Sequence, residues 1–179
     1  CKIITNLCLY KICINLKKMN KIINLAKKTL ENGNLVIFPT ETVYGLGGDA
    51  TNKNAVKKIY NIKQRPFNNP LICHFYSIKQ IELNFRINSL DYDLANIFWP
   101  GPLTLILKRK KTSKITPLLS NNLDFVGCRI PNNLTALELL KSVNFPIAAP
   151  SANLATKISP TRLNDISKEL INKSFFIDG

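Results

Sequence analysis

The chain has 179 residues, of which 45% are hydrophobic and 20% are charged, a composition that predicts one globular domain and excludes a disordered chain. Lys and Arg total 25 against 11 acidic residues, giving a net charge of +14. The excess predicts attraction to phosphates or acidic surfaces. The alternative is compositional drift in a proteome rich in Lys, Asn and Ile.

The first eighteen residues differ in composition from the rest. They contain three of the five cysteines and four lysines but no acidic residue, and the only methionine, Met19, follows them. We interpret residues 1–18 as an upstream-translated or non-native extension and residues 19–179 as the domain. A targeting extension is the alternative, although transit peptides are usually rich in Arg and Ser, and no apolar stretch here is long enough to span a bilayer.

Past Met19 the pattern alternates between helix and strand. The first predicted helix has an apolar face made of Ile22, Leu25, Ala26, Thr29 and Leu30. Gly33 then predicts a left-handed cap at its C-terminus. Residues 35–38 form a short apolar run, typical of a buried strand, which Pro39 ends.

A second helix, marked by Ala55, Val56, Ile59 and Tyr60, is predicted to end near Pro66, and residues 71–76 are predicted to form a second strand. Further strands are predicted at residues 103–107, 124–128, 146–149 and 175–178. Further helices are predicted near residues 91–98, 134–141 and 161–170. This order predicts a layered α/β domain (α+β in some schemes) with a mixed β-sheet.

The glycine-rich string at residues 45–48 follows a strand and invites a nucleotide-binding interpretation. Its spacing is not the dinucleotide fingerprint, no predicted helix opens on it, and the sequence contains no P-loop. Taken alone, the string is interpreted as glycines in a turn.

The cysteines and arginines carry two further expectations. No cysteine pair has the spacing and neighbouring histidine of a zinc site, and Cys73 and Cys128 lie in strand-like runs, which predicts buried, reduced thiols in a cytoplasmic protein. Only five of the basic residues are arginine, whose planar fork binds phosphate or carboxylate in a way that lysine cannot. Arg65 and Arg129 stand inside motif-like strings and are the candidates for such a contact, whereas Arg86 and Arg109 are interpreted as ordinary surface residues.

Short polar clusters stand at the ends of the apolar segments. In chain order they occupy residues 39–47, 63–66, 69–71, 99–104, 129–131, 149–153 and 159–161. In order and spacing they resemble the YrdC-like threonylcarbamoyl-AMP synthases over residues 19–179. The resemblance implies the three-layer YrdC-like fold, a twisted mixed β-sheet flanked by helices.

The resemblance also implies an activity. Members of that family join L-threonine, bicarbonate and ATP into threonylcarbamoyl-AMP and pyrophosphate, for N6-threonylcarbamoyladenosine modification of tRNA. It therefore implies a cytoplasmic nucleotidyltransferase that uses ATP as a substrate, with Mg²⁺ carried mainly by the ATP phosphates and no protein metal site. Threonylcarbamoyl-transfer proteins would act downstream, weak tRNA binding is a further expectation, and no membrane partner is expected.

Such a reaction depends on positioning and charge neutralisation, because a carbamate oxygen must attack the α-phosphorus of ATP and expel pyrophosphate. By the resemblance, the catalytic tetrad is Lys63, Arg65, Ser151 and Asn153. ATP binding is implied for Lys63, Arg65, Asn69, Asn153 and Thr161. Threonine binding is implied for Thr42, His74, Arg129 and Ser151.

Three of these residues also have ordinary structural explanations. Lys63 and Arg65 fit a solvated helix C-terminus, where cations are favoured. His74, the only histidine, fits a structural residue on the strand face that it would share with Ile72 and Tyr76. The Trp-Pro-Gly-Pro string at residues 99–102 is interpreted as an architectural turn.

Family members continue past the turn matched by Asp178 and Gly179, so we expect residues 19–179 to be a domain truncated at its C-terminus.

Two other classes of function stay open. One is a basic RNA-binding module of the same fold without catalysis, although aromatic residues make up only 8% and are not interleaved with the basic ones. The other is a carbamoyl-transfer domain of a larger maturation enzyme, which would need fused neighbouring domains.

Overall fold

The computed structural model describes the backbone of residues 2–178 and the side chains of residues 17–178. The strands are β1 (Val36–Phe38), β2 (Gly45–Asp49), β3 (Ile72–His74), β4 (Phe85–Arg86), β5 (Leu105–Arg109), β6 (Phe125–Arg129), β7 (Ile147–Ala148) and β8 (Phe175–Phe176). The helices are α1 (Lys2–Glu31), α2 (Lys53–Lys63), α3 (Ile78–Glu82), α4 (Ser89–Phe98), η1 (Pro117–Ser120), α5 (Leu134–Ser142), η2 (Leu163–Asp165) and α6 (Lys168–Asn172).

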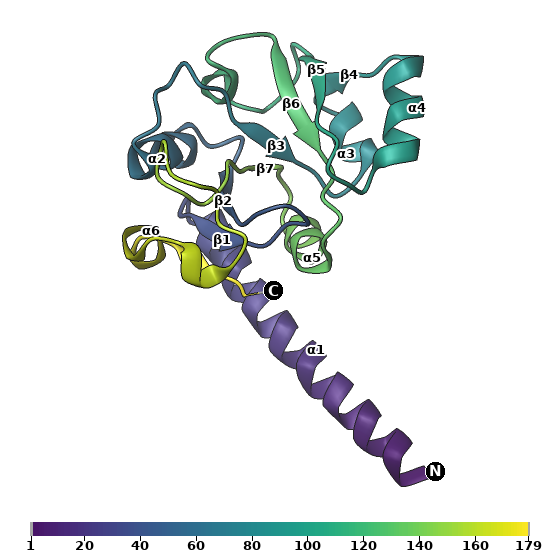
Figure 1. Cartoon of the computed structure of the whole chain (residues 1–179). Helices are drawn as coiled ribbons and strands as arrows, with labels where there is room; N and C mark the ends of the chain where they lie inside the picture. Colours follow the sequence, from purple (N-terminus) through teal and green to yellow (C-terminus); the bar gives the residue numbers. More distant parts are fainter. Residues whose placement is uncertain (1, 179) are drawn as a thin grey trace.

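These strands form one mixed sheet in the order β4-β5-β6-β3-β7-β2-β1-β8 (Figure 1). β3 pairs parallel with β6 and β1 pairs parallel with β8, whereas the other pairs are antiparallel. The α/β class and the mixed sheet expected from the sequence are therefore confirmed.

Helix α1 packs against the domain through its C-terminal part. Ile23, Ala26 and Leu30 are buried at helical spacing, and Gly33 has the predicted left-handed conformation, with φ +68°. Leu25 was wrongly placed on the buried face and is 45% exposed. The helix begins at Lys2 and extends away from the sheet in Figure 1, so the predicted boundary at Met19 falls within it and stays a prediction.

The glycine-rich string is strand β2, not a turn. A Cβ at Gly47 would lie 2.7 Å from Phe38 Cε1 and 2.8 Å from Ile147 Cγ2, closer than real Cβ contacts. Close packing against β1 and β7 therefore requires glycine here. This packing accounts for the glycine-rich string, and no nucleotide-binding role is needed to explain it.

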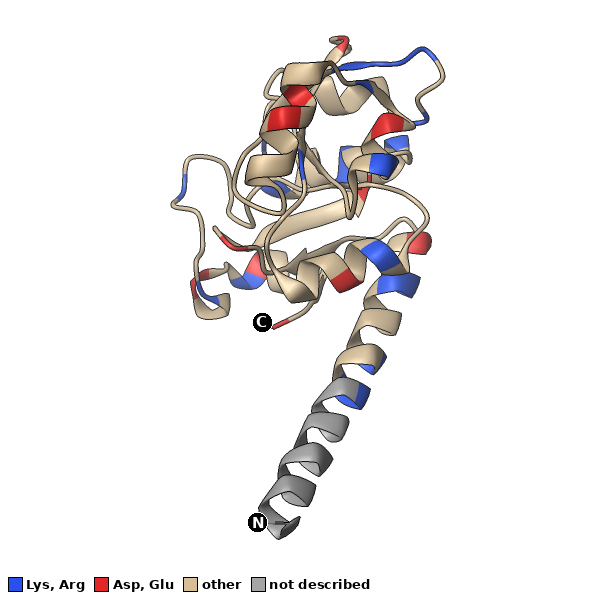
Figure 2. Ribbon diagram, turned by 90° about the vertical axis from the view of Figure 1, so that its right-hand side faces the viewer, with Lys and Arg blue, Asp and Glu red and all other residues tan. Residues whose placement is uncertain are grey.

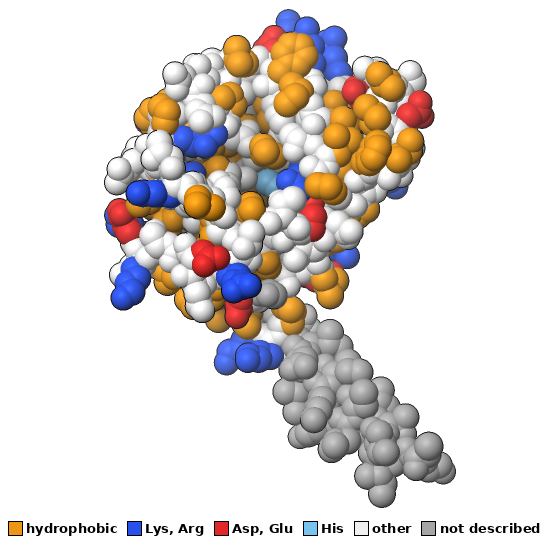
Figure 3. All heavy atoms as spheres, in the orientation of Figure 1, with side chains coloured by type: hydrophobic (Ala, Val, Ile, Leu, Met, Phe, Trp, Pro, Cys, Tyr) orange, Lys and Arg blue, Asp and Glu red, His pale blue; other side chains and the backbone are white. Residues whose placement is uncertain are grey.

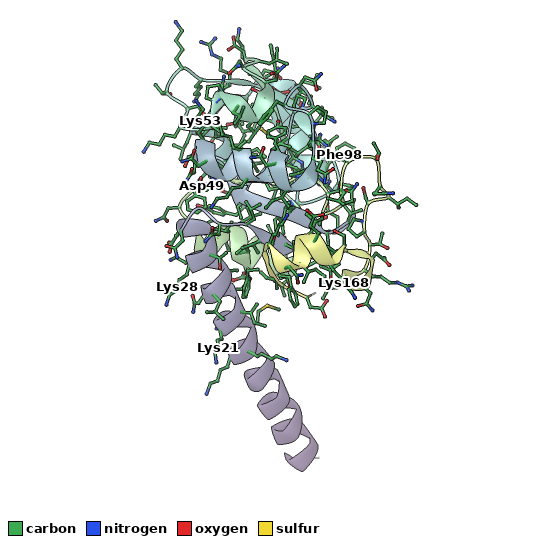
Figure 4. The ribbon with its side chains drawn as sticks, turned by 90° about the vertical axis from the view of Figure 1, so that its left-hand side faces the viewer. Lys21, Lys28, Asp49, Lys53, Phe98 and Lys168 are labelled. Atoms are coloured by element: carbon green, nitrogen blue, oxygen red, sulfur yellow. The ribbon has the colours of Figure 1, made fainter. Side chains whose placement is uncertain are left out.

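Helix α2 follows β2 after a short turn, whose ends Asp49 and Lys53 are labelled in Figure 4. Asn52 caps the helix by accepting hydrogen bonds from the backbone N–H groups of Asn54, at 2.9 Å, and Ala55, at 3.2 Å. The apolar face predicted for this helix is buried, and Lys63 continues that same stripe one turn further. The helix therefore directs a lysine into the interior.

Near the C-terminus the single helix predicted at residues 161–170 is wrong. Residues 163–165 and 168–172 form two short helices, because Ser167 starts a new helix between them by accepting a hydrogen bond from Leu170 N at 3.4 Å. The sequence analysis also missed β4 and α3, which are short.

The two faces of the sheet are covered differently. Helices α1 and α5 pack with β1, β7 and β8 in one apolar cluster, and α2, α4 and η1 pack on the other face in a larger one. On the α1–α5 side, the part of the sheet formed by β5 and β6 stays open, since Ile106 is 66% exposed and Phe125 is 51% exposed. An uncovered sheet surface thus adjoins the α1–α5 layer.

Cys73 and Cys128 are buried and free of disulfides, as predicted.

Candidate active site

A pocket of about 250 Å³ opens on that side of the sheet. Five of the nine residues predicted for the site line it: Thr42, Arg65, His74, Arg129 and Ser151. Figure 3 shows the pale blue side chain of the single histidine at the bottom of a hollow, with a cationic side chain beside it. Segments far apart in the sequence therefore converge on one pocket.

The parallel pairing of β3 with β6 places two of these residues side by side. His74 is in register with Arg129, and Ile72 with Gly127. Residues in register project from the same face, so Ile72, His74 and Arg129 share the pocket side. Tyr76 does not share it, because β3 ends at His74 and Tyr76 is exposed elsewhere.

His74 is a neutral group in this setting. Its burial, together with the neighbouring Arg129 charge, lowers its pKa to about 3, against a weaker opposing effect of a backbone hydrogen bond with Ile147. Its ring packs edge-on to Phe38, with centroids 6.2 Å apart. Nδ1 is buried without a hydrogen-bond partner among the described residues. His74 can therefore offer a substrate a hydrogen bond but not a charge.

Arg129 is held along one edge of its guanidinium. Glu41 Oε1 accepts hydrogen bonds from Nε, at 3.2 Å, and from Nη2. The Gly101 carbonyl accepts a second bond from Nε at 3.2 Å, and Thr42 Oγ1 lies 3.3 Å from Nη2. The turn interpreted as architectural thus also orients an arginine of the site.

The turn between β1 and β2 brings Glu41 and Thr42 to this arginine. Thr40 Oγ1 donates to the Val43 carbonyl at 2.6 Å and accepts from Val43 N at 3.2 Å, which closes the turn on itself. Thr42 is left exposed at the pocket, as its predicted role requires. Glu41 was not singled out by the sequence analysis, although it lies within the same motif.

The segment at residues 149–153 is tied to β2 by backbone contacts. Gly45 bridges to Ser151, Leu46 N donates to the Pro150 carbonyl at 2.9 Å, and Ala152 N donates to the Tyr44 carbonyl at 2.7 Å. Ser151 Oγ donates to Asn153 Oδ1. Two predicted tetrad members are thus mutually hydrogen-bonded and fixed to the sheet.

The structure contradicts a solvated helix end for Lys63, whereas its catalytic and ATP-binding roles stay predictions. Its side chain is neither on a solvated helix end nor among the residues that line the pocket, since it is only 1% exposed. Nζ donates to the backbone carbonyls of Ser151, at 2.5 Å, and Asn153. Burial, with a smaller effect of the Arg65 charge, lowers its pKa to about 8. In this structure Lys63 braces the segment that carries Ser151.

Arg65 lines the pocket from the loop after α2. Its Nε donates to the Asn69 carbonyl at 3.0 Å, and Nη2 donates to Asn69 Oδ1, at 2.5 Å, and to the Pro70 carbonyl, at 2.9 Å. Within the described part of the chain it makes no ion pair. Its positive charge therefore remains uncompensated at the pocket.

Besides Lys63, three predicted ATP-binding residues do not line the pocket. Asn69 is exposed and holds Arg65, while Asn153 Nδ2 donates to the carbonyls of Leu154, at 3.0 Å, and Lys157, at 2.6 Å. Thr161 is exposed and follows Pro160, whose carbonyl accepts from Tyr44 N at 2.9 Å. Asn69 and Asn153 therefore contact the pocket only through lining residues, Arg65 and Ser151.

Within residues 2–178, no helix has both the length and the apolar character needed to cross a membrane. The described side chains also contain no group of three or more His, Cys, Asp and Glu that could bind a metal ion.

Comparison with known proteins defines the class to which this fold and pocket belong. The model of the Sua5/YciO/YrdC family, described as telomere recombination, matches residues 28–179. The chain belongs to this family, which confirms the resemblance predicted from the motifs.

Particular relatives are also similar. The chain is 44% identical over 160 residues to the threonylcarbamoyl-AMP synthase of Pyrococcus abyssi and 45% identical over 146 residues to that of Bacillus subtilis. The matches cover 88% and 81% of this chain but 46% and 42% of the relatives, so the chain spans less than half of their length. A crystal structure of P. abyssi Sua5 complexed with L-threonine superposes with a TM-score of 0.84 and 43% identity, covering 88% of this chain and 46% of that one.

Proposed function

We propose that the chain carries the L-threonylcarbamoyladenylate synthase activity, which forms threonylcarbamoyl-AMP and pyrophosphate from L-threonine, bicarbonate and ATP. One observation carries this proposal: Thr42, Arg65, His74, Arg129 and Ser151, predicted from separate motifs, line a single pocket. The names of the relatives and the bound threonine in the similar Sua5 structure support it.

The pocket contains groups suited to each substrate. Arg129, His74 and Thr42 offer an arginine, a neutral imidazole and a hydroxyl to an amino acid that has a carboxylate and a hydroxyl of its own. Arg65 offers uncompensated charge to phosphate, and Ser151 in the same lining offers a hydroxyl as a hydrogen-bonding group. Catalysis would then consist of aligning the carbamate oxygen with the α-phosphorus while cations neutralise the phosphates.

In this proposal Mg²⁺ binds the protein together with ATP. The absence of a carboxylate cluster among the described side chains fits a metal held by the ATP phosphates, where it would neutralise charge on the departing pyrophosphate. Arg65 would contact the same phosphates directly, and no described acidic residue competes for it.

A pyrophosphate-release assay tests the proposal. We expect release from ATP only when L-threonine and bicarbonate are both present. L-Serine, which lacks the threonine methyl group, is the matched control. Equal release with L-serine, or with no amino acid, would contradict the proposed function.

A basic surface favours weak tRNA binding as an additional property. Arg86, Lys108 and Phe125 form a row across β4, β5 and β6, because Arg86 is in register with Lys108 and Lys108 with Phe125. All three are exposed, and Lys108 Nζ lies 6.0 Å from the centre of the Phe125 ring. Further basic residues follow at the end of β5 and in the loop after it, and the ribbon in Figure 2 is blue along a strand end and loop at its top. Cations beside an exposed aromatic ring suit a phosphate backbone with unstacked bases.

A further inference from the structure

Arg65 and Arg129 are anchored to the protein through the same atoms but by partners of different charge. Each uses Nε and Nη2 for its bonds to the protein, and Nη1 makes no hydrogen bond to any described residue. Arg65 is held by neutral carbonyl and amide oxygens, whereas Arg129 is held mainly by the carboxylate of Glu41. One pocket therefore has a charged end at Arg65 and an electrically balanced end at Arg129.

The ion pair of Glu41 with Arg129 is well shielded from solvent. The side chains are 16% and 10% exposed, and Glu41 Oε2 is buried without a partner among the described residues. Burying a carboxylate with one oxygen unpaired is costly, and apolar side chains would pack such a position at least as stably. A pair kept under those conditions indicates a role beyond stability.

We propose that Glu41 makes the Arg129 end of the pocket selective for a zwitterion over a simple anion. This inference rests on the proposed function and concerns how the amino acid is recognised. Arg129 Nη1 would bind the carboxylate of the amino acid, and the negative charge of Glu41 behind it would favour the ammonium group. Without Glu41, the same end would carry a net positive charge and accept any small anion.

Glu41 does not itself line the pocket, so it is a positioning residue that acts through Arg129. Its anchoring of Nε and Nη2 fixes the plane of the guanidinium and leaves the Nη1 end for the substrate. His74 is neutral and Thr42 is uncharged, so neither can replace the negative charge of Glu41 at this end.

The test compares two ligands that differ only in the ammonium group, L-threonine and (R)-3-hydroxybutyrate, by isothermal titration calorimetry. The variants are Glu41→Gln and, as a matched control, Glu138→Gln, which removes the same charge from an exposed pair with Lys141. Glu41→Gln should weaken L-threonine binding about tenfold, comparable to one charge-assisted hydrogen bond, and should strengthen 3-hydroxybutyrate binding, because the uncompensated Arg129 charge then favours a simple anion. Glu138→Gln should change neither.

Inorganic phosphate provides a second readout that needs no amino acid. Glu41→Gln should bind phosphate more tightly than the wild type, and phosphate should then compete with L-threonine. Equal weakening of L-threonine and 3-hydroxybutyrate, with no gain for phosphate, would mean that Glu41 only supports the structure, and the inference would be wrong.

The outcomes separate this inference from the proposed function. A wild-type protein that binds no L-threonine contradicts the function directly, while the phosphate comparison still tests the charge balance. Should Glu41→Gln fail to fold by circular dichroism, Glu41→Asp takes its place. Because that variant keeps the charge, it should preserve the preference for L-threonine over 3-hydroxybutyrate, and loss of the preference would overturn the inference.

Discussion

The molecule has two cationic regions, and they hold their charges in opposite ways. In the pocket, Arg65 and Arg129 are fixed by several hydrogen bonds each, and Arg129 is largely buried. At the β4–β5 edge, Arg86, Lys108 and Lys111 are exposed and make no ion pair with any described residue. A fixed guanidinium can recognise the geometry of one ligand, whereas mobile exposed cations recognise charge. We therefore expect substitutions that keep charge to be harmful in the pocket and harmless at the edge.

The largest effect is expected for Arg65→Lys. A lysine keeps the charge but cannot reproduce the fork that binds Asn69 and Pro70 while facing the pocket. Loss of one well-placed donor to a reacting oxyanion typically lowers the rate about a hundredfold. Threonine-dependent pyrophosphate release should fall by about that factor, and a wild-type rate with unchanged ATP affinity would show that charge alone suffices at Arg65.

Lys63→Met tests the cation that lies beneath the pocket. The substitution leaves the carbonyls of Ser151 and Asn153 without their buried donor, which should lower the free energy of unfolding by about 2 kcal/mol. Urea denaturation measures this loss, and Lys57→Met on the exposed side of α2 is the control. If both variants lose the same stability, Lys63 does not brace the 149–153 segment.

Much of this arrangement was predictable because it follows from local apolar patterns. The runs at residues 35–38 and 71–76 and the buried stripe of α2 were correctly assigned as strands and a helix. The same stripe, extended by one turn, would have revealed that Lys63 points inward. β2 was missed because its glycines are explained only by the side chains of Phe38 and Ile147, which other strands supply.

Contacts between distant residues were not predictable. Glu41 and Arg129 are separated by 88 residues, and nothing local to Glu41 indicates its partner. Arg86 was interpreted as an ordinary surface residue, and only the strand register brings it together with Lys108 and Phe125. Five residues of the motif strings line the pocket, but the strings did not indicate how their charges are balanced.

The pH dependence of stability should reveal the neutral histidine of the pocket. Because the folded-state pKa of His74 is lowered to about 3, the unfolded chain binds the proton more readily between pH 6.5 and 3. The part of the free energy of unfolding that depends on neutral His74 is fully present above pH 6.5. Below that pH it falls by about 1.4 kcal/mol per pH unit. Since His74 is the only histidine, the slope between pH 6.5 and 5 belongs mainly to it. Urea midpoints of wild type and His74→Asn should diverge in that range, and parallel curves would contradict the assignment.

The smallest effects are expected at the basic edge, where charge rather than geometry should matter. Reversing Lys108 and Lys111 to Glu should weaken binding of a fluorescent single-stranded RNA and reduce the salt slope of log K by about 1 for each lysine that contacts a phosphate. Lys108→Arg, which keeps the charge, should leave the affinity unchanged, in contrast to Arg65→Lys in the pocket. Fluorescence anisotropy at several salt concentrations measures both variants, with heparin as a polyanion that lacks bases. Phe125→Ala should weaken RNA binding but not heparin binding, because the ring stacks on bases and not on sulfates.

Threonine-dependent pyrophosphate release should remain at the wild-type rate in every edge variant. If none of these changes alters the RNA affinity, the RNA does not bind at the β4–β5 edge.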